Sequence, residues 1–125
     1  MAIVLSFDID GTLEVGDPPG GVTMEMVRRA HELGYLIGSC SDRPLSGQQA
    51  LWARFEIPAA FIAAKHQLED VRERVAADSY YHIGDRELDR QLAEKAGFGF
   101  WWVDEAIDEP WLLMPPTEPG STAVP

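Results

Sequence analysis

Five short apolar runs alternate with longer segments in which apolar residues recur at the spacing of a helix. This alternation is typical of a parallel sheet whose strands are joined by helices on both faces. The first and fourth runs are almost continuously apolar or aromatic, as expected for strands buried on both faces. The pattern predicts a three-layer α/β/α, Rossmann-like fold with a five-stranded parallel sheet, its strands at residues 2–7, 35–40, 60–63, 80–83 and 98–103.

The segments between the runs carry start and stop signals of short amphipathic helices. Thr23 is a suitable N-cap for the first helix, and Gly34 follows its end. Further helices are predicted over residues 45–55 and 67–77, and a last one ends at Gly97. Apolar residues at helical spacing mark the faces that we expect to be buried: Met26, Ala30 and Leu33, then Leu68, Val71 and Val75, then Leu88, Leu92 and Ala96.

Beyond residue 104 the alternation decays. Residues 105–114 are interpreted as an extension whose apolar cluster at residues 111–114 docks on the domain or forms a subunit contact in a homo-oligomer; both alternatives stay open. Residues 115–125 hold four prolines and almost nothing to pack, which predicts a disordered tail. The predicted core domain is therefore residues 1–104.

Length and charge narrow the picture to one acidic domain. The chain has 125 residues, 46% of them hydrophobic, and a formal net charge of −11. Such a charge repels phosphate backbones and anionic lipids, so we expect no non-specific nucleic-acid or membrane binding. A single cysteine, Cys40, excludes an internal disulfide framework, and no apolar run reaches the roughly 20 residues of a membrane span. With no secretory signal at its start, a cytoplasmic protein is expected.

Polar residues gather after four of the predicted strands. In an open parallel sheet, ligands lie beyond the carboxyl ends of the strands. Several carboxylates at one edge repel each other unless a cation compensates them, and oxygen ligands without paired histidines or cysteines favour Mg²⁺. The candidate residues are Asp8, Asp10, Gly11 and Thr12 after the first run, Ser41, Asp42 and Arg43 after the second, Lys65 after the third, and Asp85 and Asp89 after the fourth.

These residues resemble the motifs of the haloacid dehalogenase superfamily of phosphohydrolases. The segment Phe-Asp8-Ile-Asp10-Gly11-Thr12 is similar to the first motif in its phosphatase form. Ser41 and Lys65 match the second and third motifs, and Gly84-Asp85 followed four residues later by Asp89 resembles the fourth. The resemblance covers about residues 1–104 with the motifs in the correct order.

The resemblance implies a Mg²⁺-dependent phosphomonoester hydrolase. Asp8 would be the nucleophile that forms an aspartyl-phosphate, and Asp10 the general acid and base, a role favoured by a raised pKa. The Asp8 carboxylate, the Asp10 carbonyl and the Asp85 side chain would hold Mg²⁺, with Asp89 a direct or water-mediated ligand. Phosphate oxygens would be bound by Ser41, Lys65 and the backbone of the Gly11 turn, with Ser39 as the fallback for the hydroxyl.

No cap domain fits between the motifs, so the resemblance is to a capless member. Residues 15–22 suit a structured, hinged flap over an open site. Capless relatives act on large substrates or borrow a neighbouring subunit, so the substrate is a phosphorylated small molecule or a phosphorylated polymer end.

Two other functions stay open beside the hydrolase: a receiver-like phosphoacceptor and a catalytically silent binding module. Other polar residues have structural interpretations. Cys40 and His82 are expected in the core, Asp89 could instead complement a helix N-terminus, and His66 and Arg86 are candidates to touch substrate.

Overall fold

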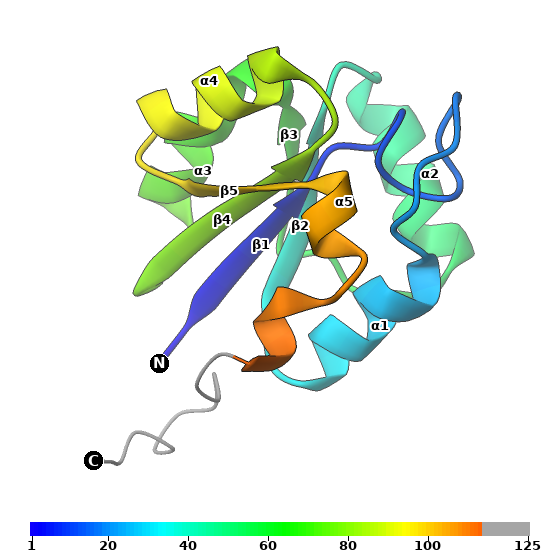
Figure 1. Ribbon diagram of the computed structural model, residues 1–125, viewed down its shortest axis with the longest axis horizontal. Coiled ribbons are helices and arrows are strands. Elements are labelled where there is room, and N and C mark those ends of the chain that lie inside the picture. The colour runs from blue at the N-terminus through cyan, green and yellow to red at the C-terminus, as the bar shows by residue number, and fades with distance from the viewer. Residues whose placement is uncertain (114–125) are drawn as a thin grey trace.

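The computed structural model describes residues 1–113 and has the predicted α/β architecture (Figure 1). Five parallel strands form one sheet in the order β3-β2-β1-β4-β5. Each predicted run overlaps one strand, with ends that differ by at most one residue. The strands are β1 Ile3–Phe7, β2 Leu36–Ser41, β3 Phe61–Ala64, β4 Ser79–Gly84 and β5 Gly99–Trp102.

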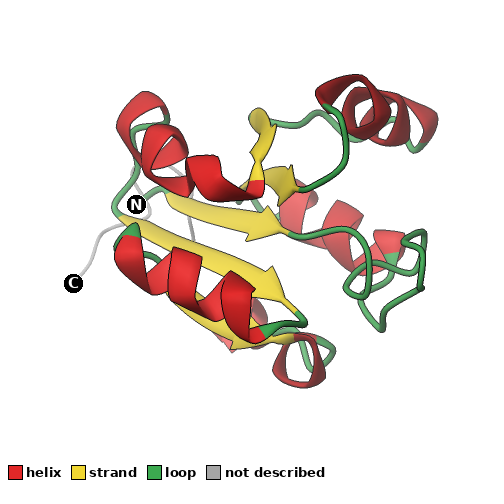
Figure 2. Ribbon diagram, turned by 90° about the horizontal axis from the view of Figure 1, so that it is seen from above, coloured by secondary structure: helices red, strands yellow, loops and turns green. Residues whose placement is uncertain are grey.

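Helices cover both faces of the sheet, and each face has its own apolar cluster (Figures 1 and 2). One cluster includes buried residues of α1 and α2, whereas the other includes buried residues of α3 and α4. The fold is therefore a three-layer α/β/α sandwich. Its helices are α1 Met24–Glu32, α2 Leu45–Arg54, α3 Leu68–Arg74, α4 Glu87–Lys95 and α5 Val103–Ala106, with 3₁₀ turns η1 Lys65–Gln67 and η2 Pro110–Leu113.

The first helix has the predicted ends but a different buried face. The Thr23 hydroxyl accepts the Met26 N–H at 3.1 Å, which confirms the N-cap, and Gly34 ends the turn with a φ of +99°. Met24, Val27 and Ala30 are buried, whereas Leu33 is 44% exposed. The predicted face is therefore wrong at Leu33, whereas Ala30 is buried and Met26 is partly buried against the same apolar cluster.

The predicted face of α4 is correct in part, because Ala96 is buried and Leu92 packs against the apolar cluster, but it is wrong at Leu88. Leu88 is 49% exposed, and the buried residues of this helix are Asp89 and Ala93. The apolar pattern predicted that Leu88 would be buried, but the buried side chain at this turn is the carboxylate of its neighbour Asp89. The sheet-facing side of α4 therefore contributes a charged group to the site as well as apolar groups to the core.

The extension after β5 packs on the domain. Trp111 is fully buried, and its ring lies edge-on to Phe7 and Trp101, each at a centroid distance of 6.1 Å. The Tyr35 hydroxyl donates a hydrogen bond to the Trp111 carbonyl. Of the predicted apolar cluster, Met114 lies outside the described residues, as does the predicted tail at residues 115–125.

No cap domain covers the carboxyl edge of the sheet within residues 1–113. The loop between β1 and α1 instead folds on itself, with hydrogen bonds from Glu14 N–H to the Val22 carbonyl and from Gly20 N–H to the Leu13 carbonyl. The predicted flap is thus anchored at its base. In the same described range, none of the helices combines the length and apolar character needed to cross a bilayer.

Candidate active site

The order of the strands brings the predicted site residues to one edge of the sheet. β1 lies at the centre between β2 and β4, so the residues that follow these strands meet. A cavity of about 140 Å³ opens there. Its lining holds six residues that were candidates from the sequence, together with Asp17 of the flap: Asp8, Asp10, Ser41, Asp42, Lys65 and Arg86.

Three carboxylates form a compact cluster beside this cavity. Asp8, Asp85 and Asp89 each offer an oxygen, and these oxygens lie within 4.8 Å of one another. Asp8 and Asp89 are buried, whereas Asp85 is exposed. A set of hard oxygen donors that is open on one side suits Mg²⁺, which keeps waters in its coordination shell. The residues present therefore fit this ion.

Glycines let the backbone approach the cluster closely. A Cβ on Gly11, which has a φ of +78°, would lie 2.0 Å from Asp85 Oδ2. A Cβ on Gly84 would lie 2.5 Å from the carboxyl carbon of Asp89. Side chains at these two positions would displace the carboxylates, so both glycines are needed for the arrangement of the site.

Lys65 supplies positive charge to the buried acids. Its Nζ lies 3.0 Å from Asp89 Oδ1, 3.4 Å from Asp8 Oδ2 and 3.7 Å from the exposed Asp42. Burial disfavours the charged ammonium, but attraction to Asp8 and Asp89 outweighs it and raises the pKa of Lys65. The lysine is therefore charged, and its position depends on the two carboxylates that it joins.

A buried histidine, His82, lies next to Asp89. His82 on β4 has no exposed surface, its Nδ1 lies 2.9 Å from the Ser6 hydroxyl, and its Nε2 lies 3.5 Å from Asp89 Oδ1. The other Asp89 oxygen accepts the Arg86 N–H at 3.1 Å. Burial lowers the pKa of His82 despite the nearby carboxylate. His82 is a core residue, as predicted, but it also touches the site.

The surroundings of Asp8 make its charge costly. Desolvation, with repulsion from Asp89, raises the pKa of Asp8 to about 7, although Lys65 and the Ile9 N–H oppose the shift. For Asp89 burial acts in the same direction, but His82 and Lys65 outweigh it and lower the pKa of that carboxyl. A cation bound between the acids would stabilise Asp8 as a carboxylate.

Asp10 lies at the rim rather than in the acid cluster. Arg43 Nη2 donates to Asp10 Oδ1 at 2.7 Å, and the Asp17 N–H of the flap donates to the same oxygen at 2.7 Å. The hydrogen bond from Arg43 holds the pKa of Asp10 below its usual value, although partial burial opposes it. This differs from the raised pKa expected for a general acid, because the Arg43 guanidinium stabilises the Asp10 carboxylate.

The two candidate hydroxyls, of Ser41 and Ser39, have different surroundings. Ser41 is buried, lines the cavity and accepts the Arg43 N–H at 3.1 Å. Ser39 donates to Gln48 Oε1 at 2.6 Å and accepts from Trp52 Nε1 at 2.9 Å. Because Ser39 is fully used in the core, Ser41 is the hydroxyl that can reach a ligand.

The expectation that the backbone of the Gly11 turn binds phosphate stays a prediction, and in this conformation the Gly11 N–H already has a partner. The Gly11 N–H donates to the Pro18 carbonyl at 2.7 Å, which joins the start of the loop to the flap. The missing side chain of Gly11 also matters because it makes room for Asp85.

Three further residues considered from the sequence, His66, Arg86 and Cys40, differ in their exposure and in their contact with the cavity. His66 is exposed and does not line the cavity, whereas Arg86 does. Cys40 is buried, as predicted, and desolvation raises the pKa of its thiol to about 12. Cys40 is therefore an inert thiol at neutral pH.

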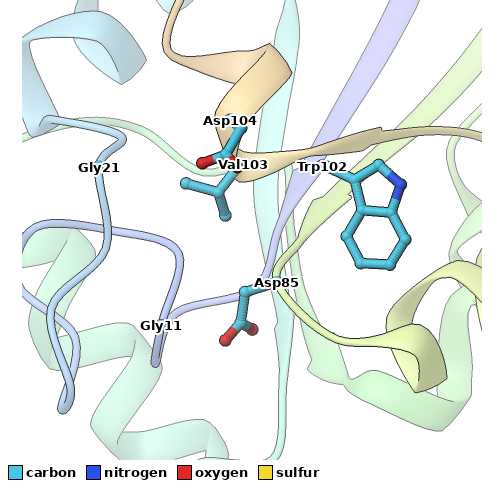
Figure 3. A pocket seen from close by; sticks show the side chains of 6 residues that line it. All are labelled: Gly11, Gly21, Asp85, Trp102, Val103 and Asp104. Carbon is cyan, nitrogen blue, oxygen red and sulfur yellow. The ribbon is translucent and has the colours of Figure 1, made fainter.

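A second cavity flanks the acid cluster on the side of β5 (Figure 3). In that view the Asp85 carboxylate points toward the Gly11 turn, with Val103 and Asp104 on the opposite side of the cavity. Trp102, the last residue of β5, is only half-buried and forms part of the wall. This cavity measures about 360 Å³ and is lined by Gly11, Gly21, Asp85, Trp102, Val103 and Asp104.

A comparison with models of known protein families found no match to this chain, and a search of curated proteins found none either.

Proposed function

We propose that this protein is a Mg²⁺-dependent phosphomonoester hydrolase that works through an aspartyl-phosphate on Asp8. One observation carries the proposal: Asp8 is buried beside Lys65, and its carboxylate belongs to a three-acid cluster at the edge of a phosphate-sized cavity. The arrangement supplies a nucleophile, a cation for phosphate oxygens and oxygen ligands for a metal. It also agrees with the resemblance to capless phosphohydrolases of the haloacid dehalogenase superfamily.

The proposed first step is in-line attack by an Asp8 carboxylate oxygen on phosphorus. The bond between phosphorus and the leaving oxygen breaks while Asp10 donates its proton to that oxygen. In the second step water attacks the phosphorus of the aspartyl-phosphate and gives a proton to Asp10. The bond from phosphorus to Asp8 then breaks and inorganic phosphate leaves. One phosphomonoester and one water become one alcohol and one phosphate.

Ser41 and Lys65 would bind the non-bridging oxygens, where negative charge must be stabilised in the transition state. Asp8, Asp85 and Asp89 would hold Mg²⁺, with the Asp10 carbonyl as a further ligand. The ion would neutralise charge on the phosphoryl group and on the acids. Since Lys65 lies 3.0 Å from Asp89 Oδ1, Asp89 also has the role of positioning the lysine.

Asp10 must hold a proton in the first step, but its pairing with Arg43 favours the carboxylate. Asp10 and Arg43 are about a third exposed, with side-chain exposures of 34% and 30%. A substrate can therefore reach this pair directly. We expect substrate entry to separate the two side chains and so to release Asp10 for acid catalysis.

The order of the strands argues against the receiver-like alternative. Flavodoxin-like sheets, to which receiver domains belong, have the order 2-1-3-4-5. The order here is 3-2-1-4-5. Asp8 and Asp10 follow β1, which is the central strand of this sheet. The alternative of a catalytically silent binding module does not explain why Asp8, Lys65 and Asp89 are buried together. Burying charged groups costs free energy, and a silent module would gain nothing from it.

Phosphate release from an aryl phosphate tests the proposal. We expect turnover with Mg²⁺, none with a chelator, and a loss of at least about 10³-fold in Asp8→Asn. Asp78→Asn is the matched control and should retain activity, because Asp78 lies just before β4, at the end of the sheet opposite to the site. Full activity without divalent cations, or in Asp8→Asn, would contradict the mechanism.

A further inference from the structure

A shallow groove begins where the proposed acid Asp10 meets its arginine partner. Arg43, which is bonded to Asp10, forms one end of the groove, and Arg54 forms another part of its wall. Val15 of the flap lines it as well. In the proposed reaction Asp10 touches the leaving oxygen, so the rest of the leaving group lies near this groove. Its volume is about 210 Å³, and its lining is Val15, Arg43, Gly47, Ala50, Leu51 and Arg54.

The groove is unusual in its charge. Two guanidinium groups line it, and among the described residues no carboxylate does, although the chain has a net charge of −11. The cavity beside β5 has the opposite character, because Asp85 and Asp104 line it and no basic residue does (Figure 3). With Asp85 committed to the proposed Mg²⁺ site, Asp104 still disfavours an anionic group of the substrate on the β5 side, whereas two arginines favour it on the α2 side.

Both arginines have donors to offer. The bonds from Arg43 to Asp10 use Nε and Nη2, which leaves Nη1 to face other partners. Arg54 is exposed, and its guanidinium lies over the Phe55 ring at 5.1 Å from the centroid. Stacking of this kind orients a guanidinium without using its N–H groups, which remain free for planar recognition of an oxyanion.

A glycine keeps the middle of the groove open. Gly47 is the third residue of α2 and so lies in the first turn of that helix. A Cβ at Gly47 would have no heavy atom within 4 Å, so close packing does not require glycine here. Since Gly47 lines the groove and a Cβ there would meet open space, a longer side chain at this position is expected to take up room in the groove.

From the position, charge and openness of this groove, we propose that the leaving group of the substrate carries an anionic group of its own, bound by Arg54 and Arg43. This inference rests on the proposed phosphatase function and specifies its substrate class. The anion could be a second phosphoryl group, a carboxylate or the next phosphodiester of a phosphorylated oligonucleotide. These sources share one chemistry, an oxyanion a few bonds from the scissile phosphate.

Matched substrate pairs test this inference on the full chain with Mg²⁺. The pairs are glucose 1-phosphate with glucose 1,6-bisphosphate, glycerol 3-phosphate with 3-phosphoglycerate, and thymidine 5′-phosphate with a 5′-phosphorylated thymidine trinucleotide. We expect the more anionic member of at least one pair to have a kcat/KM about tenfold higher or more, and the pair that shows it identifies the source of the anion.

Two variants then tie the preference to the groove. Arg54→Gln and Gly47→Leu should each lower kcat/KM for the preferred substrate about tenfold, mainly through KM, and leave the rate on an aryl phosphate unchanged. Arg74→Gln removes the same charge from α3, on the other face of the sheet, and should leave the preference intact.

The outcomes separate this inference from the proposed function. Aryl phosphatase activity without any preference for an anionic leaving group would overturn the inference alone. A preference that survives both Arg54→Gln and Gly47→Leu would overturn it as well. The absence of phosphate release from every substrate would overturn the proposed function, and this inference with it.

Discussion

Asp8 and Asp10 are two residues apart in one loop, yet the structure gives them opposite surroundings. Asp8 lies at the buried floor of the site, 3% exposed, with Lys65 and Asp89 beside it. Asp10 lies at the rim, paired with Arg43 and with the flap. Burial raises the pKa of Asp8 to about 7, whereas the arginine lowers the pKa of Asp10.

The comparison shows that depth and partners set the proton affinity of an acid more strongly than its place in a motif does. Without ligands, the proposed nucleophile is the group that more readily holds a proton, and the proposed acid is the group that does not. The proposed chemistry requires the reverse. Binding of the metal and the substrate must therefore exchange the two states. Four predictions test the buried floor around Asp8 and the rim around Asp10.

Lys65→Met should have the largest effect, because it leaves two buried carboxylates without their cation. We expect kcat to fall about 10³-fold and the free energy of unfolding at pH 8 to fall by about 3 kcal/mol. Steady-state rates on an aryl phosphate and urea unfolding measure the two effects. The exposed Lys95→Met carries the same change of charge and should alter neither; a Lys65→Met rate within tenfold of the wild type would contradict the role of the lysine.

The affinity for Mg²⁺ should depend on pH through Asp8. A raised pKa means that the folded protein holds a proton on Asp8 below about pH 7, and Mg²⁺ must displace it. The affinity should therefore fall by up to about tenfold per pH unit from pH 7 to 5 and level off above pH 7. Titration calorimetry of Mg²⁺ measures this slope. Asp8→Asn should bind more weakly with a shallower slope, and an equally steep slope in that variant would refute the assignment.

His82→Phe should weaken the floor of the site without removing its charges. The aromatic ring is kept, but Ser6 and Asp89 lose a polar neighbour, which we expect to cost about 2 kcal/mol in the free energy of unfolding. Urea unfolding of His82→Phe, Ser6→Ala and the double variant forms a thermodynamic cycle. If Ser6→Ala costs as much in the His82→Phe background as in the wild type, the two residues are not coupled.

Arg43→Gln should have the smallest effect on stability, less than about 1 kcal/mol, because the pair at the rim is solvent-exposed. A lowered pKa of Asp10 stabilises the fold above the unfolded-state pKa of this group, and that contribution is lost as the pH falls through the folded-state value. The difference between wild type and variant should therefore be present at pH 7 and vanish in acid. In Asp10→Asn the same substitution should have no further effect on stability.

The strands and most motif residues could be predicted because their signals are local. Apolar runs mark buried strands, and residues at their ends meet at one edge whatever the loops do. Asp8, Ser41, Lys65 and Asp85 were placed by this reasoning, and the structure brings them together. Thr23 was recognisable as an N-cap because capping depends on a few neighbouring residues.

The partners of these residues could not be predicted, because they are set by contacts across the sheet. Arg43 is 33 residues from Asp10, and His82 is 76 residues from Ser6. Neither pairing leaves a mark in the sequence. Burial of Asp89 contradicts the apolar pattern of its helix, although its place four residues after Gly84-Asp85 had already made it a candidate ligand. The docking of Trp111 was left open for the same reason.

The central position of β1 also has a consequence for the order in which the protein is made. This strand precedes the other four in the chain, yet its second neighbour, β4, begins at Ser79, and a ring that packs on Phe7 belongs to Trp111. A nascent chain therefore exposes an unpaired strand edge and an open core until nearly all of the described fold has left the ribosome. Exposed edges and apolar surfaces of this kind bind chaperones or aggregate. Folding during synthesis should thus be late and abrupt rather than gradual.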